Sequence, residues 1–208
     1  MEKIFENETI GILQSFVGFY DSIWSPNDAI YYECEEEGIE EDVDFTFDYK
    51  QYRQDVCRAY TEVWESWMQE FISNDIELDF VEVHSPRYYN YENDSCRVKI
   101  RLTQAAEDAI IAKIEKHRDQ LAKWIKENHT SYDGFFSNLS NDIDQWPSRL
   151  FDSDETFQPA YLFCMLYYIV KAEYLAIGET ESLEYEAYGR ICEDISVTSY
   201  MKDIKKVA

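Results

Sequence analysis

Three residues between positions 84 and 96 have side chains that could form a nucleophilic site. His84 and Cys96 flank a turn-rich segment, and Asp94 lies close to the cysteine. A thiol becomes a nucleophile when an imidazole accepts its proton and a third group orients that imidazole. Cys96, however, begins an alternating run with apolar residues on its side, and apolar surroundings raise a thiol pKa and disfavour the thiolate. We therefore expect no catalytic residue and predict that the protein is not an enzyme.

A run of carboxylates is the other feature with chemical potential. It contains nine acidic residues and no basic one: Glu33, Glu35, Glu36, Glu37, Glu40, Glu41, Asp42, Asp44 and Asp48. A calcium loop needs oxygen ligands at set spacings around a central glycine, and Gly38 fits that spacing only loosely, so we expect no metal ion and no cofactor. Two interpretations stay open. One is a solvated loop or helix end kept soluble by its charge, and the other is a surface that imitates nucleic-acid phosphates.

The whole chain carries a net charge of −24, from 43 acidic and 19 basic residues. This excess opposes binding to nucleic-acid phosphates and to anionic membranes, so we expect a basic partner instead. Duplex DNA carries one charge per roughly 1.7 Å of axis, so 24 charges match about 41 Å, or about a dozen base pairs. The first functional hypothesis is an inhibitor that binds a basic, nucleic-acid-binding protein by mimicking DNA.

The residues expected to carry this binding lie in two acidic stretches, the run above and the start of the last predicted helix. Carboxylates at i and i+4 on a helix lie about 5–6 Å apart at Cβ, close to phosphate spacing, so acidic rows need no special fold. The predicted partner-binding carboxylates are Glu33, Glu35, Glu36, Glu37, Glu40, Glu41, Asp42, Asp44, Glu181, Glu184 and Glu186.

A tyrosine-rich turn supports a second hypothesis. Tyr88, Tyr89 and Tyr91 lie between two strand-like runs, in a segment whose Pro86, Asn90 and Asn93 favour turn conformations. These rings could form the binding edge of a structural or regulatory interaction module, with the acidity serving only solubility. Binding through the acidic surface would weaken steeply with salt, whereas binding through the aromatic turn would be nearly independent of salt.

The same turn carries a family resemblance. Ser85-Pro-Arg-Tyr-Tyr-Asn-Tyr91 followed by Asp94 resembles a short motif of small uncharacterised proteins from bacteriophages and mobile elements, in which Ser-Pro, Tyr-Asn-Phe and Thr-Asp precede a strand. Tyr91 replaces the phenylalanine and Asn93 the threonine, and the match covers about a dozen of 208 residues. The resemblance implies a phage or mobile-element setting and carries no activity with it. Under the DNA-mimicry hypothesis, the targets would include restriction enzymes or CRISPR effectors.

Strand-like alternation places this turn in a hairpin over residues 76–102. Cys96, Val98, Ile100 and Leu102 alternate with basic residues, and Ile76, Leu78 and Phe80 alternate with acidic ones. Antiparallel pairing would set Glu77 and Asp79 opposite Arg101 and Lys99, which helps to fix the register. The alternation changes phase at Phe80 and Val81, and we expect a bulge there. A further N-terminal strand is predicted within residues 9–24, which are rich in aromatic and β-branched residues.

Helical periodicity dominates the rest of the chain. The strongest predicted helix spans residues 49–72 with Asp48 as its cap, and a second spans 104–128 with Thr103 as its cap. His117 falls on the apolar stripe of the second helix, and we expect a hydrogen-bonded histidine at the core edge. A central core helix follows Pro159 and ends at Gly178, and an acidic helix covers residues 181–195. Short helices broken at Pro147 are expected over residues 130–158.

These elements predict an α+β fold in one domain over residues 1–208. A small antiparallel sheet, formed by the N-terminal strand and the 76–102 hairpin, would pack against several helices. Residues 1–102 would form the mixed part and residues 103–208 a helical part. The five cysteines form no C-x-x-C pair, which favours reduced thiols. With no signal peptide and no long apolar run in view, we expect a cytoplasmic protein. The sequence leaves the oligomeric state open.

Overall fold

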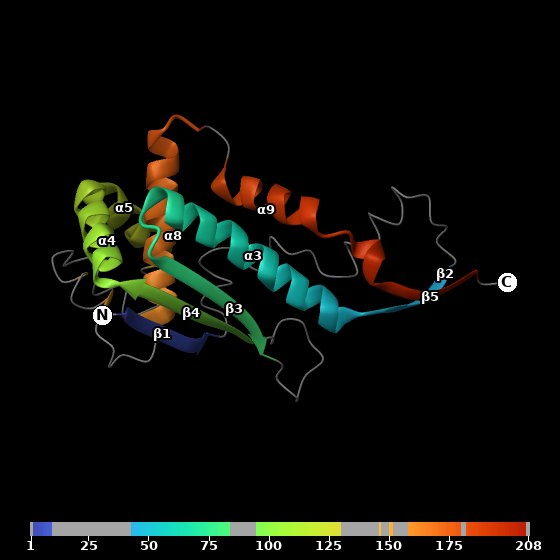
Figure 1. Ribbon diagram of the computed structural model, residues 1–208. Coiled ribbons are helices and arrows are strands. Elements are labelled where there is room, and N and C mark those ends of the chain that lie inside the picture. Colours follow the sequence, from blue (N-terminus) through green and yellow to red (C-terminus); the bar gives the residue numbers. More distant parts are fainter. Residues whose placement is uncertain are drawn as a thin grey trace.

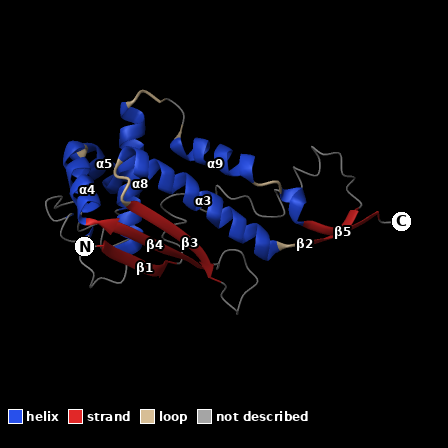
Figure 2. Ribbon diagram, in the orientation of Figure 1, coloured by secondary structure: helices blue, strands red, loops and turns tan. Residues whose placement is uncertain are grey.

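The computed structural model has an α+β fold (Figures 1 and 2), as the sequence predicts. It describes residues 2–9, 43–83, 95–129, 146, 150–151, 158–179 and 182–206. The elements are β1 Glu2–Thr9, β2 Val43–Phe47, α3 Tyr49–Phe71, β3 Ile76–Val83, β4 Ser95–Thr103, α4 Gln104–Lys116, α5 Arg118–His129, α8 Gln158–Ala176, α9 Leu183–Asp194, the 3-10 helix η3 Val197–Tyr200 and β5 Met201–Lys206.

The main sheet has the antiparallel order β1-β4-β3, and its register confirms the predicted hairpin. Glu77 pairs with Arg101 and Asp79 with Lys99, and the Glu77 and Arg101 side chains form an ion pair at 3.4 Å. The predicted bulge is wrong, because pairing continues without a shift from Ile76 to Val83. Val81 instead occupies a ladder position opposite Arg97, so an apolar residue takes a place in the charged row.

The N-terminal strand of the sheet lies earlier in the chain than predicted. β1 covers residues 2–9, while residues 10–24 of the predicted strand lie outside the described residues. Glu6 stands opposite Lys99 and Glu8 opposite Arg97. The basic row of β4 therefore has acidic neighbours on both sides, and opposite charges at facing positions favour this register. The complementary charges therefore determine the position and register of β1, because its own apolar alternation is weak.

Helix α3 covers the sheet and closes its β3 edge. Asp48 caps the helix, as predicted, by accepting a hydrogen bond from the Gln51 amide at 3.2 Å. Farther along, Glu65 Oε2 accepts from the Leu78 amide at 2.6 Å, and Gln69 Nε2 donates to the Ile76 carbonyl at 2.9 Å. Exposed strand edges invite pairing with other chains, and these two side chains satisfy the edge groups instead.

Replacing Glu65 with alanine is expected to lower the free energy of unfolding by about 2 kcal/mol, because a hydrogen bond to a charged acceptor is lost beside a half-buried amide. Urea denaturation measures the loss, and hydrogen exchange should become faster at the Leu78 amide. Glu65→Gln retains an acceptor oxygen and should lose less. Glu62→Ala, at an exposed position of the same helix, is the control. Unchanged exchange at Leu78 in Glu65→Ala would show that the bond does not protect this edge.

The predicted central helix is confirmed as α8, which packs against α3 and the sheet (Figure 1). Every residue from Leu162 to Val170 is buried. Trp64 of α3 meets the Phe163 and Tyr167 rings at centroid distances of 6.2 and 5.2 Å. Gly178 ends the segment with φ of +94°, a left-handed conformation that glycine adopts without strain.

The predicted helix over residues 104–128 is two helices, because the chain breaks between α4 and α5 at His117. Thr103 caps α4 as predicted, and the apolar stripe continues through the break into α5: Ala106, Ile110, Ile114, Leu121 and Ile125 are at most 1% exposed. His117 Nε2 lies 2.7 Å from Glu173 Oε1 on α8, which confirms the predicted hydrogen-bonded histidine at the core edge. Periodicity alone does not reveal the break, since the stripe continues across it.

A second sheet of two strands, β2-β5, lies at the end of α3 away from α4 and α5 (Figure 1). This sheet is not among the predicted elements, and residues 43–47 of the acidic run are a strand rather than a solvated loop or helix end. Asp44 stands opposite Lys205, and Asp48 forms an ion pair with Lys202 at 2.5 Å. The predicted helical part also ends in a strand, because basic residues of β5 face the acidic end of β2.

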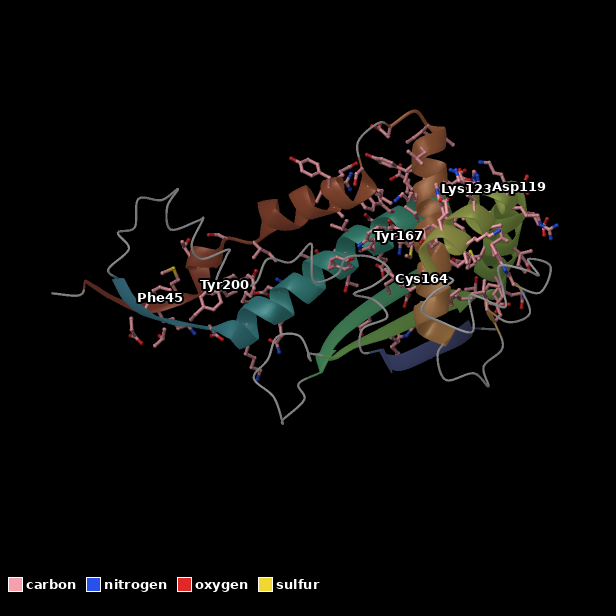
Figure 3. The ribbon with its side chains drawn as sticks, turned by 180° about the vertical axis from the view of Figure 1, so that it is seen from behind. Phe45, Asp119, Lys123, Cys164, Tyr167 and Tyr200 are labelled. Carbon is pink, nitrogen blue, oxygen red and sulfur yellow. The ribbon has the colours of Figure 1, made fainter. Side chains whose placement is uncertain are left out.

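Aromatic packing ties this small sheet to the body, and Phe45 and Tyr200 are labelled there in Figure 3. Tyr200 lies 5.3 Å from the Tyr52 ring and donates a hydrogen bond to Asp55 at 3.0 Å. Burial and the neighbouring Asp55 carboxylate raise the pKa of Tyr200 to about 12, so its hydroxyl remains a donor. Two-stranded sheets are marginal alone, and this contact supplies the missing support.

The remaining described residues bear on two further predictions. Trp146 and Leu150 are helical and fully buried, while the expected break at Pro147 lies outside the described residues. Among the helices that the structure describes, none combines the length and apolar character needed to cross a bilayer.

A candidate docking surface where α8 meets α9

Helix α9 follows α8 in the chain and begins with a local cap. After Gly178, Ser182 caps α9 by accepting a hydrogen bond from the Tyr185 amide at 3.3 Å. The Glu186 amide donates to the Ser182 carbonyl at 3.1 Å. A serine in extended conformation at the cap satisfies amides that a helix start leaves without partners. The first turn of α9 is therefore held in a defined position.

The inner side of this turn is fixed to the core. The Tyr174 hydroxyl of α8 donates to Glu186, which also pairs with Arg190 at 2.5 Å. The Arg190 guanidinium lies 4.9 Å from the centre of the Trp67 ring, a cation–π contact. Glu186 thus acts within the fold, and its charge is largely compensated by Arg190.

The outer side exposes apolar side chains. Leu175, Ile177 and Tyr185 are 42%, 63% and 70% exposed, and Ile4 is the fourth large exposed hydrophobic residue among those described. The Tyr174–Glu186 bond joins the last turns of α8 to the first turns of α9, and the first three of these residues belong to those two helix ends and to the chain just after α8. Single exposed apolar residues are ordinary, but several of them near one helix junction are a candidate interaction site. We call Leu175, Ile177 and Tyr185 the corner patch.

The sequence around the corner patch is strongly acidic. No basic residue occurs between Lys171 and Arg190, and five glutamates do. Glu173 is buried in the fold, and the other four follow at positions 179, 181, 184 and 186. Glu179 is exposed, Glu184 belongs to the first turn of α9, and Glu181 lies outside the described residues. An apolar centre with an acidic surround fits a partner surface that is basic around an apolar pocket.

The structure brings only part of the predicted site together. Glu184 and Glu186 both lie on α9 beside the corner patch, and Asp44 lies far along the chain on β2, opposite Lys205. The other predicted binding residues fall outside the described residues: Glu33, Glu35, Glu36, Glu37, Glu40, Glu41, Asp42, Tyr88, Tyr89, Tyr91 and Glu181.

The sequence analysis missed the apolar half of this surface. Leu175 follows Lys171 by four residues and so shares its polar helix side, and Tyr185 lies off the Leu183–Ala187 stripe that α9 buries. Both residues are apolar at positions where the helical pattern predicts polar ones. This mismatch is the feature of the sequence that could have indicated an exposed apolar surface.

A second cluster of charged groups joins α4 and α5 to α8. Glu173 is buried, and its Oε1 lies 2.8 Å from Lys116 Nζ, 3.1 Å from Lys113 Nζ and 2.7 Å from His117 Nε2. Burial alone would raise the pKa of Glu173, but hydrogen bonds from Lys116, His117 and Lys113 outweigh it and lower the pKa to about 2. A carboxylate held ionised in this way is suited to locking helices together rather than to exchanging protons.

The described residues offer no obvious metal centre, since no three His, Cys, Asp or Glu side chains among them converge to hold an ion. No protein-family model, curated protein or solved structure matches the chain in the comparisons made. Charge and the corner patch are therefore the features of this protein that bear on its function.

Proposed function

We propose that this protein acts by binding, and that its partner is a basic, nucleic-acid-binding protein which it inhibits by presenting carboxylates in place of DNA phosphates. The distribution of charge supports this proposal. The described residues contain 25 acidic and 17 basic side chains, a net charge of −8, whereas the other 74 residues contain 18 acidic and 2 basic ones, a net charge of −16. Two thirds of the excess therefore lies in about one third of the chain.

Within the described elements, much of the acidic charge already has a basic neighbour. The sheet sets Glu6, Asp79 and Lys99 side by side on the ladder, and Glu173 and Asp48 form ion pairs. If acidity served solubility alone, no such separation between compensated and uncompensated regions would be required. The segment over residues 33–42, with seven carboxylates and no basic residue, is the main candidate for phosphate mimicry.

The corner patch adds what carboxylates alone lack. Charge complementarity mainly increases association rates and specificity, while a few buried apolar and aromatic residues supply most of the affinity of an interface. We propose that Leu175, Ile177 and Tyr185 anchor the partner and that the surrounding glutamates steer it. The motif at Ser85 to Asp94 favours a phage or mobile-element origin. The partner that we propose is a restriction or CRISPR enzyme in the cytoplasm.

A capture experiment tests the proposal. The full chain, immobilised, is exposed to bacterial lysate with and without nuclease, and retained proteins are identified. We expect a basic nucleic-acid-binding protein whose retention survives nuclease, weakens steeply between about 50 and 200 mM salt, and is competed by duplex DNA. Capture that nuclease abolishes, or binding indifferent to both salt and DNA, would contradict mimicry. Salt-independent binding would support the tyrosine-rich turn instead.

A pair of charge variants separates local from global effects. Neutralising Glu35, Glu36, Glu37, Glu40 and Glu41 to glutamine is expected to weaken binding to the captured partner at least tenfold. The control variant changes the net charge by the same amount as the first variant. It neutralises five exposed acidic residues on α3, α4 and α5, namely Glu62, Glu70, Asp108, Asp119 and Glu127. Titration of the partner by fluorescence anisotropy compares the two. Equal losses would show that net charge, and not this segment, determines binding.

A further inference from the structure

The two edges of the main sheet differ in the hydrogen bonds that the described residues make to them. On β3, Glu65 and Gln69 of α3 bond to the outward amide of Leu78 and the carbonyl of Ile76. On β1, the described part of the chain supplies no further strand and no backbone hydrogen bond to the outer edge. Unpaired strand edges are templates for pairing, and natural proteins commonly block the ones they do not use. Among the described elements, β1 is the edge left available.

The register defines what kind of strand suits this edge. β1 already pairs on its inner side with β4, where Arg97 and Lys99 stand opposite Glu8 and Glu6. The remaining positions in that row are Glu2 and Ile4, and Ile4 is 54% exposed. Successive residues of a strand alternate between faces, so Ile4, Glu6 and Glu8 share one face of the sheet. In a second strand paired beside β1, every other residue would lie on the same face as this acidic row.

We infer that the outer edge of β1 binds an extended segment of a partner protein in which basic residues alternate with apolar ones. The pattern is that of β4 itself, Cys-Arg-Val-Lys-Ile-Arg-Leu over residues 96–102, which β1 accepts on its other side. Backbone hydrogen bonds would supply affinity, as in other strand additions, and the acidic row would select basic side chains at alternate positions.

A second copy of this chain fits the edge poorly. An antiparallel pairing of β1 with itself about Phe5, with the two sheets facing the same way, would set Glu2 opposite Glu8 of the other copy. It would also set Ile4 opposite Glu6. Like charges directly opposite each other destabilise a strand pair, so self-association is not the expected use of this edge. The inference does not depend on DNA mimicry, because it rests on strand pairing.

Peptide binding to the full-length protein tests the inference. The probe is a fluorescein-labelled peptide, Ser-Ser-Arg-Val-Lys-Ile-Arg-Leu-Thr, which repeats the β4 pattern. We expect binding by anisotropy together with slower hydrogen exchange at residues 2–9. A peptide of the same composition with the alternation broken carries the same charge and should bind at least tenfold more weakly. Equal binding of the two peptides would mean attraction by net charge alone and would overturn the inference.

A substitution in β1 provides a second test of the inference. Ile4→Lys places a positive charge at an exposed position opposite Arg101, and it should weaken the alternating peptide about tenfold. The like charges at this pair should lower the melting temperature only slightly, because cross-strand pairs contribute about 0.2–1 kcal/mol. Protection of residues 2–9 that is already complete in the free protein, with no change on adding peptide, would show that another segment of this chain covers the edge. That result would also overturn the inference.

Discussion

Replacing Glu173 with glutamine is expected to lower the free energy of unfolding by about 3 kcal/mol. The carboxylate is 11% exposed as a side chain and accepts from Lys113, Lys116 and His117. Removing one member of a buried ion cluster costs about 3–5 kcal/mol, because the remaining charges keep their desolvation cost without compensation. Lys116 is half exposed, so the lower part of that range applies.

The pH dependence of this effect has a defined sign. The pKa of Glu173 falls from 4.5 to about 2 on folding, so the ionised cluster stabilises the native state fully above pH 4.5. That contribution is lost as the pH falls from 4.5 towards 2. The difference in stability between wild type and Glu173→Gln should therefore be constant near neutrality, shrink below pH 4.5 and vanish near pH 2. Comparing the two proteins cancels the titration of the other acidic residues.

Chemical denaturation followed by tryptophan fluorescence measures both effects. Glu115→Gln is the matched control, since Glu115 is exposed on the same helix α4 and lies 3.8 Å from Arg118. Exposed ion pairs contribute little, so this variant should change stability by less than about 1 kcal/mol. A Glu173→Gln protein as stable as the control would show that the cluster does not lock α8 to α4 and α5.

Where local chemistry determines structure, the sequence was a good guide. The hairpin register follows from strict alternation plus facing charges, so the sequence alone predicts Glu77 and Asp79 opposite Arg101 and Lys99. Asp48 and Thr103 cap their helices because capping needs only a short polar side chain and nearby amides. His117 could be assigned to the core edge for the same kind of reason, from its place on an apolar stripe.

Elements that depend on distant partners were not predictable in this way. β2 lies in a run of carboxylates, and it becomes a strand because basic β5, more than 150 residues later, pairs with it. β1 likewise takes its place from the basic row of β4. β1 lacks the apolar alternation that marks a strand, and cross-strand charge supplies its specificity. β2 does alternate, with Val43, Phe45 and Phe47 as its apolar positions, but this short signal lies within a run of carboxylates.

The candidate site shows the same division. Glu184 and Glu186 were selected from composition, and the structure assigns Glu186 to the internal contacts with Tyr174 and Arg190. The number of carboxylates in a sequence does not show which of them form hydrogen bonds or ion pairs within the fold. The apolar half of the surface depends on how α8 and α9 are placed relative to each other. A local sequence pattern does not predict that placement.

Replacing the corner patch, with Leu175, Ile177 and Tyr185 all changed to serine, is expected to weaken binding of the captured partner by a factor of about a hundred or more. Anchoring residues at the centre of an interface each contribute on the order of 1–2 kcal/mol when truncated, and tyrosine is prominent among them. All three side chains are substantially exposed in the free protein, so the free energy of unfolding should change little. Surface plasmon resonance should show the loss mainly as faster dissociation.

A charge variant at the same corner distinguishes anchoring from steering. Glu179→Gln with Glu184→Gln should slow association and reduce its salt dependence, while leaving dissociation nearly unchanged. Tyr174→Phe loses the hydrogen bond to Glu186 and should reduce stability without altering the exposed surface. If the triple serine variant binds as wild type, the corner patch is not the anchor. If it fails to bind and the charge pair is silent, apolar contact at the corner carries the affinity and the carboxylates that direct the partner lie elsewhere in the chain.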